Sequence, residues 1–199
     1  FTDKGDGTSQ MGSPVHIYCD ADYAGDLDDR RSMSGLMVSI AGCLVYWRAK
    51  KQGGVTLSTM ESEIVSLGTA VQFNEYIVAL LTELGIETEM PSVIREDNQS
   101  AIAYTKNAKN QSKARHIGVR FHYIRESVRD GKVRIIYCPT DQMLADIFTK
   151  RLPTDQFEYL RNGIGIVMVP DGMRDDKQMI AKIATIYGEW ECREFRIER

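Results

Sequence analysis

VHIYCDAD, at residues 15–22, sets the pattern from which the rest of the chain can be interpreted. Every second residue from Val15 to Cys19 is apolar, and this period of two predicts a β-strand. The strand ends in Asp20 and Asp22, and a spacing of two residues on a strand places both carboxylates on one face. Neighbouring carboxylates repel each other, so the pair is a candidate for a functional site. The alternative is an ordinary strand that runs into a polar turn.

The composition predicts one globular domain, followed by a tail. The chain has 199 residues, of which 43% are hydrophobic and 27% are charged, and these are ordinary values for a globular protein. No apolar run approaches the roughly 20 residues that cross a bilayer, and the N-terminus does not read as a signal peptide, so we expect no membrane partner. The N-terminus also does not read as a start of translation, and we expect a segment of a longer chain. A net charge of −3 argues against a protein that only coats nucleic acid.

The cysteines indicate neither a zinc site nor a disulfide framework. They lie far apart, without the C-x-x-C pairs or nearby histidines of a metal site, so we expect small core residues in a reducing, intracellular setting. The four are Cys19, Cys43, Cys138 and Cys192.

The apolar periodicity predicts three strands, a long helix, a strand, two helices, a strand and a last helix. The strands are expected at 15–22, 35–41, 43–48, 92–96 and 132–138, with a few more extended residues at 55–58. The helices are expected from 59 to a stop at Gly85, and at 101–106, 119–129 and 141–150. Residues 1–13 are expected to be a lead-in, 14–160 the domain and 161–199 a tail without assigned structure.

Four acids stand at the ends of these elements or among core residues. Asp20 ends the first strand, Glu63 opens the long helix, Asp97 follows the fourth strand, and Asp146 lies among apolar residues of the last predicted helix. Acids in such places are uncommon unless they are paired or bind a cation. Magnesium is held by a few carboxylates, waters and phosphates, and two such ions about 4 Å apart can promote phosphodiester hydrolysis.

Six segments match one family in order and spacing, and together they cover about residues 16–160. On these motifs the chain resembles the RNase H domain of copia-type (Pseudoviridae) LTR retrotransposon Pol polyproteins. The segments are YCDADYAGDLDDRRSMSG at 18–35, YWRAKKQ at 46–52, LSTMESEIVSL at 57–67, EDNQSAI at 96–102, RHIGVRFHYIRE at 115–126 and DQMLADIFTKRLP at 141–153.

The resemblance implies an α/β, RNase H-like fold: a five-stranded mixed sheet, three antiparallel strands first, flanked by helices. It implies a ribonuclease H that cuts the RNA strand of RNA/DNA hybrids during reverse transcription. Its partners would be the hybrid and the reverse transcriptase domain of the same polyprotein, without a small-molecule cofactor. The location would be intracellular, in a cytoplasmic retrotransposon particle, with the nucleus as an alternative. The implied catalytic residues and ligands of two Mg²⁺ ions, for which Mn²⁺ is a candidate substitute, are Asp20, Glu63, Asp97 and Asp146.

Two other acids compete for places in this site. Glu61 is the rival of Glu63, and two residues apart on a helix they cannot share a face, so only one can serve. We choose Glu63 and rank Asp22, which can assist through water, below the four. The chain also departs from the family's pattern: residues 139–142 lack the histidine that many RNases H carry there, and Gly118 replaces a usual aspartate.

Two groups of basic residues are candidates for binding the hybrid. Residues 98–125 contain several lysines and arginines but no acid, which favours a surface that tracks phosphates, with a solvated basic face as the alternative. A second group lies beside Trp47. The residues that we expect to contact nucleic acid are Arg48, Lys50, Lys51, Asn98, Gln99, Ser100, Lys113, Arg115 and His116.

Two other functions stay open from the sequence. One is a catalytically inactive remnant that binds nucleic acid or tethers the polyprotein, which the glycine at 118 and the unassigned tail favour. The other is a related nuclease, such as an integrase or a Holliday-junction resolvase. The order Asp-Glu-Asp-Asp fits RNase H better than the Asp-Asp-Glu of an integrase.

Overall fold

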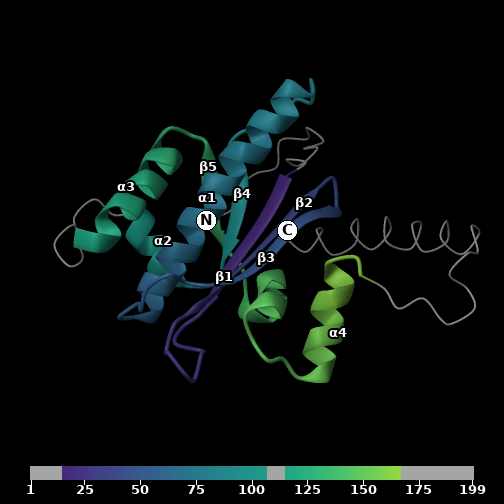
Figure 1. Cartoon of the computed structure of the whole chain (residues 1–199). Coiled ribbons are helices and arrows are strands. Elements are labelled where there is room, and N and C mark those ends of the chain that lie inside the picture. The colour runs from purple at the N-terminus through teal and green to yellow at the C-terminus, as the bar shows by residue number, and fades with distance from the viewer. Residues whose placement is uncertain (1–14, 107–114, 167–199) are drawn as a thin grey trace, which may run out of the picture.

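β1 (Val15–Asp22) lies at the centre of a five-stranded sheet whose strand order is β3-β2-β1-β4-β5. The computed structural model describes residues 15–106 and 115–166. β2 is antiparallel to both β1 and β3, whereas β4 and β5 run parallel to β1 (Figure 1). The other strands are β2 (Met33–Ile40), β3 (Cys43–Lys51), β4 (Ser92–Glu96) and β5 (Val133–Tyr137). The predicted five-stranded mixed sheet is therefore confirmed.

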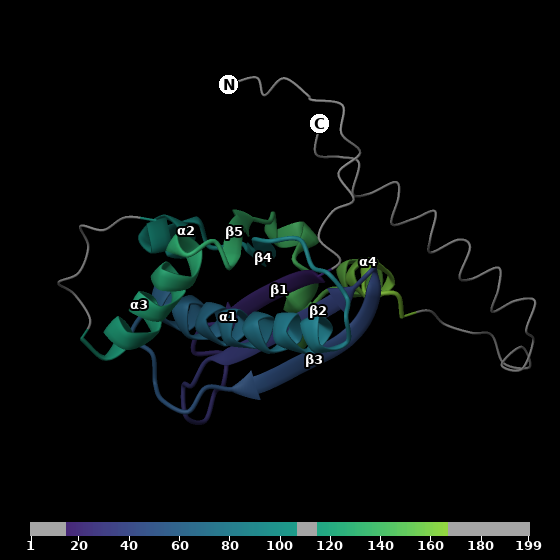
Figure 2. The same cartoon turned by 90° about the horizontal axis from the view of Figure 1, so that it is seen from above.

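α1 (Thr59–Glu83) packs along one face of this sheet, with α2 (Gln99–Lys106) and α3 (Arg115–Arg129) beside it (Figure 2). Ser58 caps its N-terminus by accepting a hydrogen bond from the backbone N–H of Glu61, so residues 55–58 lead into the helix and form no strand. By length and composition α1 could cross a membrane, but half of the relevant window is buried inside the fold. A core helix of a globular protein has the same properties.

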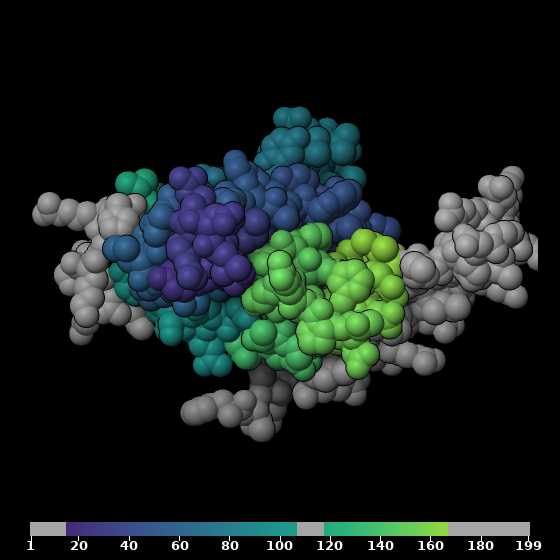
Figure 3. All heavy atoms as spheres, turned by 60° about the horizontal axis from the view of Figure 1, so that its bottom comes forward, coloured from purple at the N-terminus to yellow at the C-terminus, as the bar shows by residue number. Residues whose placement is uncertain are grey.

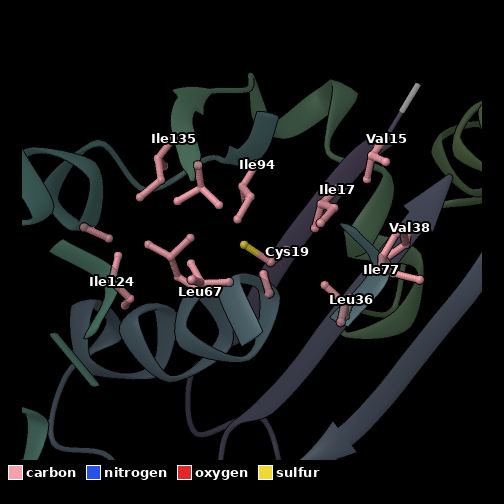
Figure 4. Packing of buried hydrophobic residues seen from close by; sticks show 14 of the residues in the cluster. Val15, Ile17, Cys19, Leu36, Val38, Leu67, Ile77, Ile94, Ile124 and Ile135 are labelled. Carbon is pink, nitrogen blue, oxygen red and sulfur yellow. The ribbon is translucent and has the colours of Figure 1, made fainter. Parts of the chain in front are cut away.

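The main core lies between the sheet and these three helices. Residues of β1 and β2 that alternate along each strand, such as Ile17 and Val38, pack with Leu67 of α1 and Ile94 of β4. Figure 4 shows Cys19, Ile94 and Leu67 facing one another in this layer. The pattern of small and branched apolar residues thus holds the central strand against the long helix. This packing fixes where β1 ends relative to the first turn of α1.

A second, smaller core covers the opposite face of the sheet. Tyr18 and Met37 point away from the main core and pack with Met143 and Ala145. These residues belong to two short 3₁₀ turns, η1 (Thr140–Gln142) and η2 (Leu144–Phe148). The prediction of one helix over 141–150 is wrong. Met143 is buried and adopts an extended backbone between the two turns, because its side chain enters this core.

A helix that the sequence analysis missed follows these turns. α4 (Thr154–Gly163) begins directly after Pro153 and buries Leu160. Ile164, just beyond it, joins the second core. The sequence carries a signal for this helix. Pro153 marks its start, and Leu160 and Ile164 are four residues apart, as on one face of a helix. The proposed division at residue 160 stays a prediction, as do the lead-in and the tail, most of whose residues lie outside the described part.

Candidate active site

Three of the four predicted acids meet where β1 and β4 end. Asp20 lies in β1, Glu63 in the first turns of α1, and Asp97 directly after β4, and one carboxylate oxygen from each lies within 4.8 Å of the other two. Because β1 and β4 are parallel neighbours, their carboxyl ends bring Asp20 and Asp97 to one edge of the sheet. We call Asp20, Glu63 and Asp97 the three-acid group.

Glu63 of this group is buried and has a strongly raised pKa. Its side chain is buried, and its Oε2 atom has no hydrogen-bond partner in the described part of the chain. Burial, followed by the charges of Glu96, Asp20 and Asp97, raises the pKa of Glu63 from 4.5 to about 11. A buried carboxylate with an unpartnered oxygen, grouped with two other carboxylates, is a suitable ligand set for a hard divalent cation. The residues present therefore fit a divalent metal ion.

Glu61, the rival of Glu63, is occupied elsewhere. Its Oε2 accepts a hydrogen bond of 2.7 Å from the backbone N–H of Leu57, while its own N–H donates to Ser58 Oγ at 3.2 Å. This reciprocal arrangement caps the start of α1 and resembles a capping box. The structure therefore brings Glu63, and not Glu61, into the three-acid group.

Asp146 lies in η2, is buried and stands outside the three-acid group. Lys150 Nζ stands between this acid and Asp20, donating to Asp146 Oδ1 at 2.8 Å and to Asp20 Oδ1 at 3.0 Å. The hydroxyl of Thr149 donates to the other oxygen of Asp20. Burial and the charge of Asp20 raise the pKa of Asp146 to about 7, although Lys150 acts in the opposite direction. Asp146 is thus close to the site but separated from the three-acid group by an ammonium.

The close contact between η2 and the sheet depends on Gly35, which pairs with Asp20 across the β1–β2 ladder. A Cβ atom at this position would lie 2.7 Å from Thr149 Cγ2 and 2.8 Å from the carbonyl oxygen of Ala145. Only glycine lets the backbone of η2 approach this closely. Figure 3 shows the result, with the green surface of the η turns directly beside the purple surface around the end of β1.

Glu96 is a fifth acid that the sequence analysis missed. It is fully buried at the end of β4, where it accepts hydrogen bonds from the N–H of Asn98 at 3.1 Å and from Cys19 Sγ at 3.4 Å. Burial raises its pKa to about 8, partly offset by the Asn98 N–H. The sequence carries a signal for this burial. Ser92, Ile94 and Glu96 alternate along β4, so all three face the same, buried side of the sheet.

The structure also places Asp22 and three of the four cysteines. Asp22 lies outside the three-acid group, and its pKa is raised by burial and by Asp20. Cys19 and Cys138 are buried as expected, whereas Cys43 is exposed, because it begins β3 at the edge of the sheet. Cys192 lies outside the described residues.

Three of the predicted nucleic-acid contacts line a cavity of about 150 Å³ beside the site. Arg48, Lys50 and Lys51 come from β3, and Arg120 of α3 joins them across α1. Lys51 is paired with Asp26 and Asp29, but Arg48, Lys50 and Arg120 have no acidic partner among the residues that the structure describes. The cavity wall includes Ser66 and Gly35, and Ser66 Oγ donates to the Asp20 carbonyl at 2.9 Å.

The remaining predicted contacts fall around the start of α2 or outside the described residues. Asn98 caps α2, its Oδ1 accepting from the N–H of Ala101 at 3.0 Å, and Gln99 and Ser100 are exposed in the first turn. Lys113 lies outside the described residues. Arg115 and His116 begin α3, but their side chains are outside the described part.

The sequence comparisons relate this chain to transposon polyproteins. No protein-family model matches. The chain is 38% identical over 156 residues to the retrovirus-related Pol polyprotein from transposon RE2 of Arabidopsis thaliana, a match to 78% of this chain and 11% of that polyprotein. It is 35% identical over 149 residues to the Pol polyprotein from transposon TNT 1-94 of Nicotiana tabacum, a match to 75% of this chain and 11% of the relative.

The structural comparison agrees with these matches at the level of the fold. The structure of LC11-RNase H1, isolated from compost by a metagenomic approach, superposes with a TM-score of 0.50 at 16% identity, covering 68% of this chain and 91% of that one. The fold is therefore that of an RNase H-like domain. The chain is a homologue of copia-type retrotransposon Pol polyproteins and spans about a tenth of the length of the relatives that it matches.

Proposed function

We propose that this chain is a ribonuclease H that hydrolyses the RNA strand of RNA/DNA hybrids in a reaction that depends on Mg²⁺. The observation that carries the proposal is the three-acid group, with the unpartnered Glu63 Oε2 buried inside it. A protein gains no stability from three carboxylates placed this close together, so their arrangement supports binding of a divalent cation. The similarity to Pol polyproteins supports the class of substrate.

Each acid has a distinct part in this proposal. Asp20, Glu63, Asp97 and Asp146 would hold two metal ions. When bound, these ions supply an activated water and stabilise the leaving oxygen of the scissile phosphate. Asp20 belongs to the three-acid group and shares Lys150 with Asp146, so it would contribute to holding both ions. Burial raises the pKa of Glu96, which favours the protonated carboxyl and so limits the negative charge beneath the site.

The cavity beside β3 supplies a candidate surface for the nucleic-acid backbone. Its positive charge comes from Arg48, Lys50 and Arg120, which have no acidic partners in the described residues. The cavity wall also includes Gly35, which pairs with Asp20 across the β1–β2 ladder. Such cations position a duplex through its phosphates without reading its sequence. We propose that the hybrid lies along this cavity toward the start of α2.

The proposal also gives the chain a biological setting. The Pol polyprotein relatives support a role beside a reverse transcriptase domain of the same polyprotein. The location that accompanies this role is a cytoplasmic retrotransposon particle, with the nucleus as the alternative.

The test is a cleavage assay with a hybrid that carries the label on its RNA strand, in Mg²⁺ and in EDTA. We expect the parent chain to cut the RNA strand only with Mg²⁺, and Asp97→Asn to bind the hybrid without cutting it. Asp130→Asn is the matched control, because Asp130 is exposed in the turn before β5, at the opposite end of the sheet. Hybrid binding without turnover by the parent would favour an inactive binding domain, and cleavage by Asp97→Asn would refute the site.

A further inference from the structure

Lys150 places an ammonium group inside the acidic site. It bridges Asp20 and Asp146 at 3.0 and 2.8 Å, and both carboxylates are buried. The side chain of Lys150 itself keeps 30% of its surface exposed. A buried pair of carboxylates is therefore held together by a cation that still has access to solvent.

Among the residues that the structure describes, Lys150 touches the three-acid group only through Asp20, and no lysine or arginine forms a hydrogen bond with Glu63 or Asp97. Glu63 Oε2 has no partner in the described residues, and Asp97 accepts a hydrogen bond of 2.9 Å from the neutral hydroxyl of Thr140. Asp20 belongs to both arrangements, because its Oδ1 faces Lys150 while the residue also joins the three-acid group. The ammonium of Lys150 is thus in direct contact with Asp20 and Asp146, but not with Glu63 or Asp97.

The chain builds this arrangement from local spacing and close packing. Asp146 and Lys150 are four residues apart. Thr149 and Lys150 are the first two residues after η2. Gly35 lets this segment approach β2 opposite Asp20. Thr149 and Lys150 together occupy both oxygens of Asp20, so the segment sets the orientation of that carboxylate.

We propose that Lys150 is a positioning residue that holds Asp20 and Asp146 in the metal-free protein and competes with one divalent ion for them. The inference rests on the proposed function, since it assumes that the acids bind metal. An ion that uses both Asp20 and Asp146 has to displace the ammonium, because two cations this close repel each other. Lys150 can leave, since its flexible stem already reaches solvent. The two ions therefore bind with unequal affinity, and the ion on the Asp146 side binds more weakly.

Calorimetric titration of the full chain with Ca²⁺, without nucleic acid, tests this competition. We expect the parent chain to bind one ion more tightly than a second. In Lys150→Met the second ion should bind roughly tenfold more tightly or better, because the competing charge is gone. Lys132→Met is the matched control, since Lys132 pairs with Glu75 on an exposed surface, and it should bind Ca²⁺ as the parent does.

Thermal unfolding of the same proteins separates competition from a structural role. In EDTA, Lys150→Met should unfold at a lower temperature than the parent, and Ca²⁺ should raise this temperature more in the variant than in the parent. If Lys150→Met is destabilised but binds both ions as the parent does, Lys150 is structural and the inference is wrong, while the proposed function stands. If neither protein binds an ion, the inference and the proposed function are both wrong.

Discussion

Asp97 and Asp146 flank the same residue, Asp20, but the protein surrounds them differently. Asp97 belongs to a group of carboxylates in which Glu63 keeps one buried oxygen without a partner in the described residues. Asp146 shares with Asp20 the ammonium of Lys150 and lies next to the hydroxyl of Thr149. Burial and neighbouring charges raise the pKa of both Glu63 and Asp146, but only Asp146 also has a cation of the protein in direct contact.

This difference shows which part of the site depends on a ligand. The three-acid group loses its repulsion only when protons or a metal ion arrive, so its charge state should follow pH and metal concentration. The Asp146 side has the ammonium of Lys150 as a partner within the fold and depends on the packing of η2 against β2.

Asp20→Asn should have the most severe effect, because Asp20 is the acid that both sides share. We expect its kcat/KM for hybrid cleavage to fall by about 10³-fold or more, since the loss of a shared metal ligand removes several kcal/mol of transition-state stabilisation. Asp146→Asn should lose less, because the three-acid group stays intact. Steady-state kinetics on the labelled hybrid measure both. Equal losses in the two variants would contradict the division.

Gly35→Ala should damage the Asp146 side while leaving the three-acid group in place. The new methyl group would lie within 3 Å of Thr149 and of the Ala145 carbonyl, and such overpacking costs about 1–3 kcal/mol of unfolding free energy. Denaturant unfolding and Ca²⁺ titration measure the two effects. Gly118→Ala is the control, because a Cβ there meets no atom within 4 Å, and a helical Gly→Ala change should be neutral or stabilise by up to about 1 kcal/mol. A stable Gly35→Ala with unchanged cleavage would show that the close approach is unimportant.

The stability of the metal-free protein should fall as the pH rises above about 5. The pKa values of Glu63 and Glu96, about 11 and about 8, lie above those of the unfolded chain, so the native state binds more protons through this range. Their stabilising contribution is complete below the unfolded pKa near 4.5 and is lost as the pH rises through the native values. Melting temperatures in EDTA between pH 5 and 9 measure the decline.

Two comparisons make this pH experiment specific. Glu63→Gln should show a shallower decline, because the largest of the raised pKa values is removed. Saturating Mg²⁺ should also flatten the profile, since the ion replaces the protons of the three-acid group. A parent protein whose stability in EDTA rises from pH 5 to 9 would contradict the raised pKa values.

Glu61→Ala should give the smallest effect and separates Glu61 from Glu63. The loss of the helix cap should cost about 1 kcal/mol of unfolding free energy, while Ca²⁺ affinity stays that of the parent. Denaturant unfolding and calorimetry test the two halves of this prediction. A large loss of Ca²⁺ affinity would place Glu61, and not only Glu63, among the metal ligands.

The sequence predicts the sheet and α1 well because their signals are local and strong. The period of two in β1 and the helical spacing after Ser58 follow directly from burial on one face or one stripe. The meeting of Asp20 with Asp97 was also accessible, since acids that follow neighbouring parallel strands share one edge. The choice of Glu63 over Glu61 followed from a resemblance, and the capping contacts of Glu61 supply a physical reason.

Residues 140–163 were harder because tertiary contacts decide their conformation. The apolar spacing of residues 141–150 fits a helix, but burial of Met143 in the second core forces an extended residue between two short turns. The spacing of Asp146 and Lys150 is visible in the sequence, yet nothing local shows that Lys150 also reaches Asp20, 130 residues away. That contact depends on the close approach at Gly35.

The most direct test of the account is the position of Mn²⁺ in crystals of this chain, located by its anomalous scattering. We predict a peak held by the carboxylates of Asp20, Glu63 and Asp97, which appears at lower Mn²⁺ concentration than any peak at Asp146. An anomalous map without a peak at the three-acid group, in crystals where Mn²⁺ is bound only elsewhere or not at all, would contradict the central claim that this group is a divalent metal site.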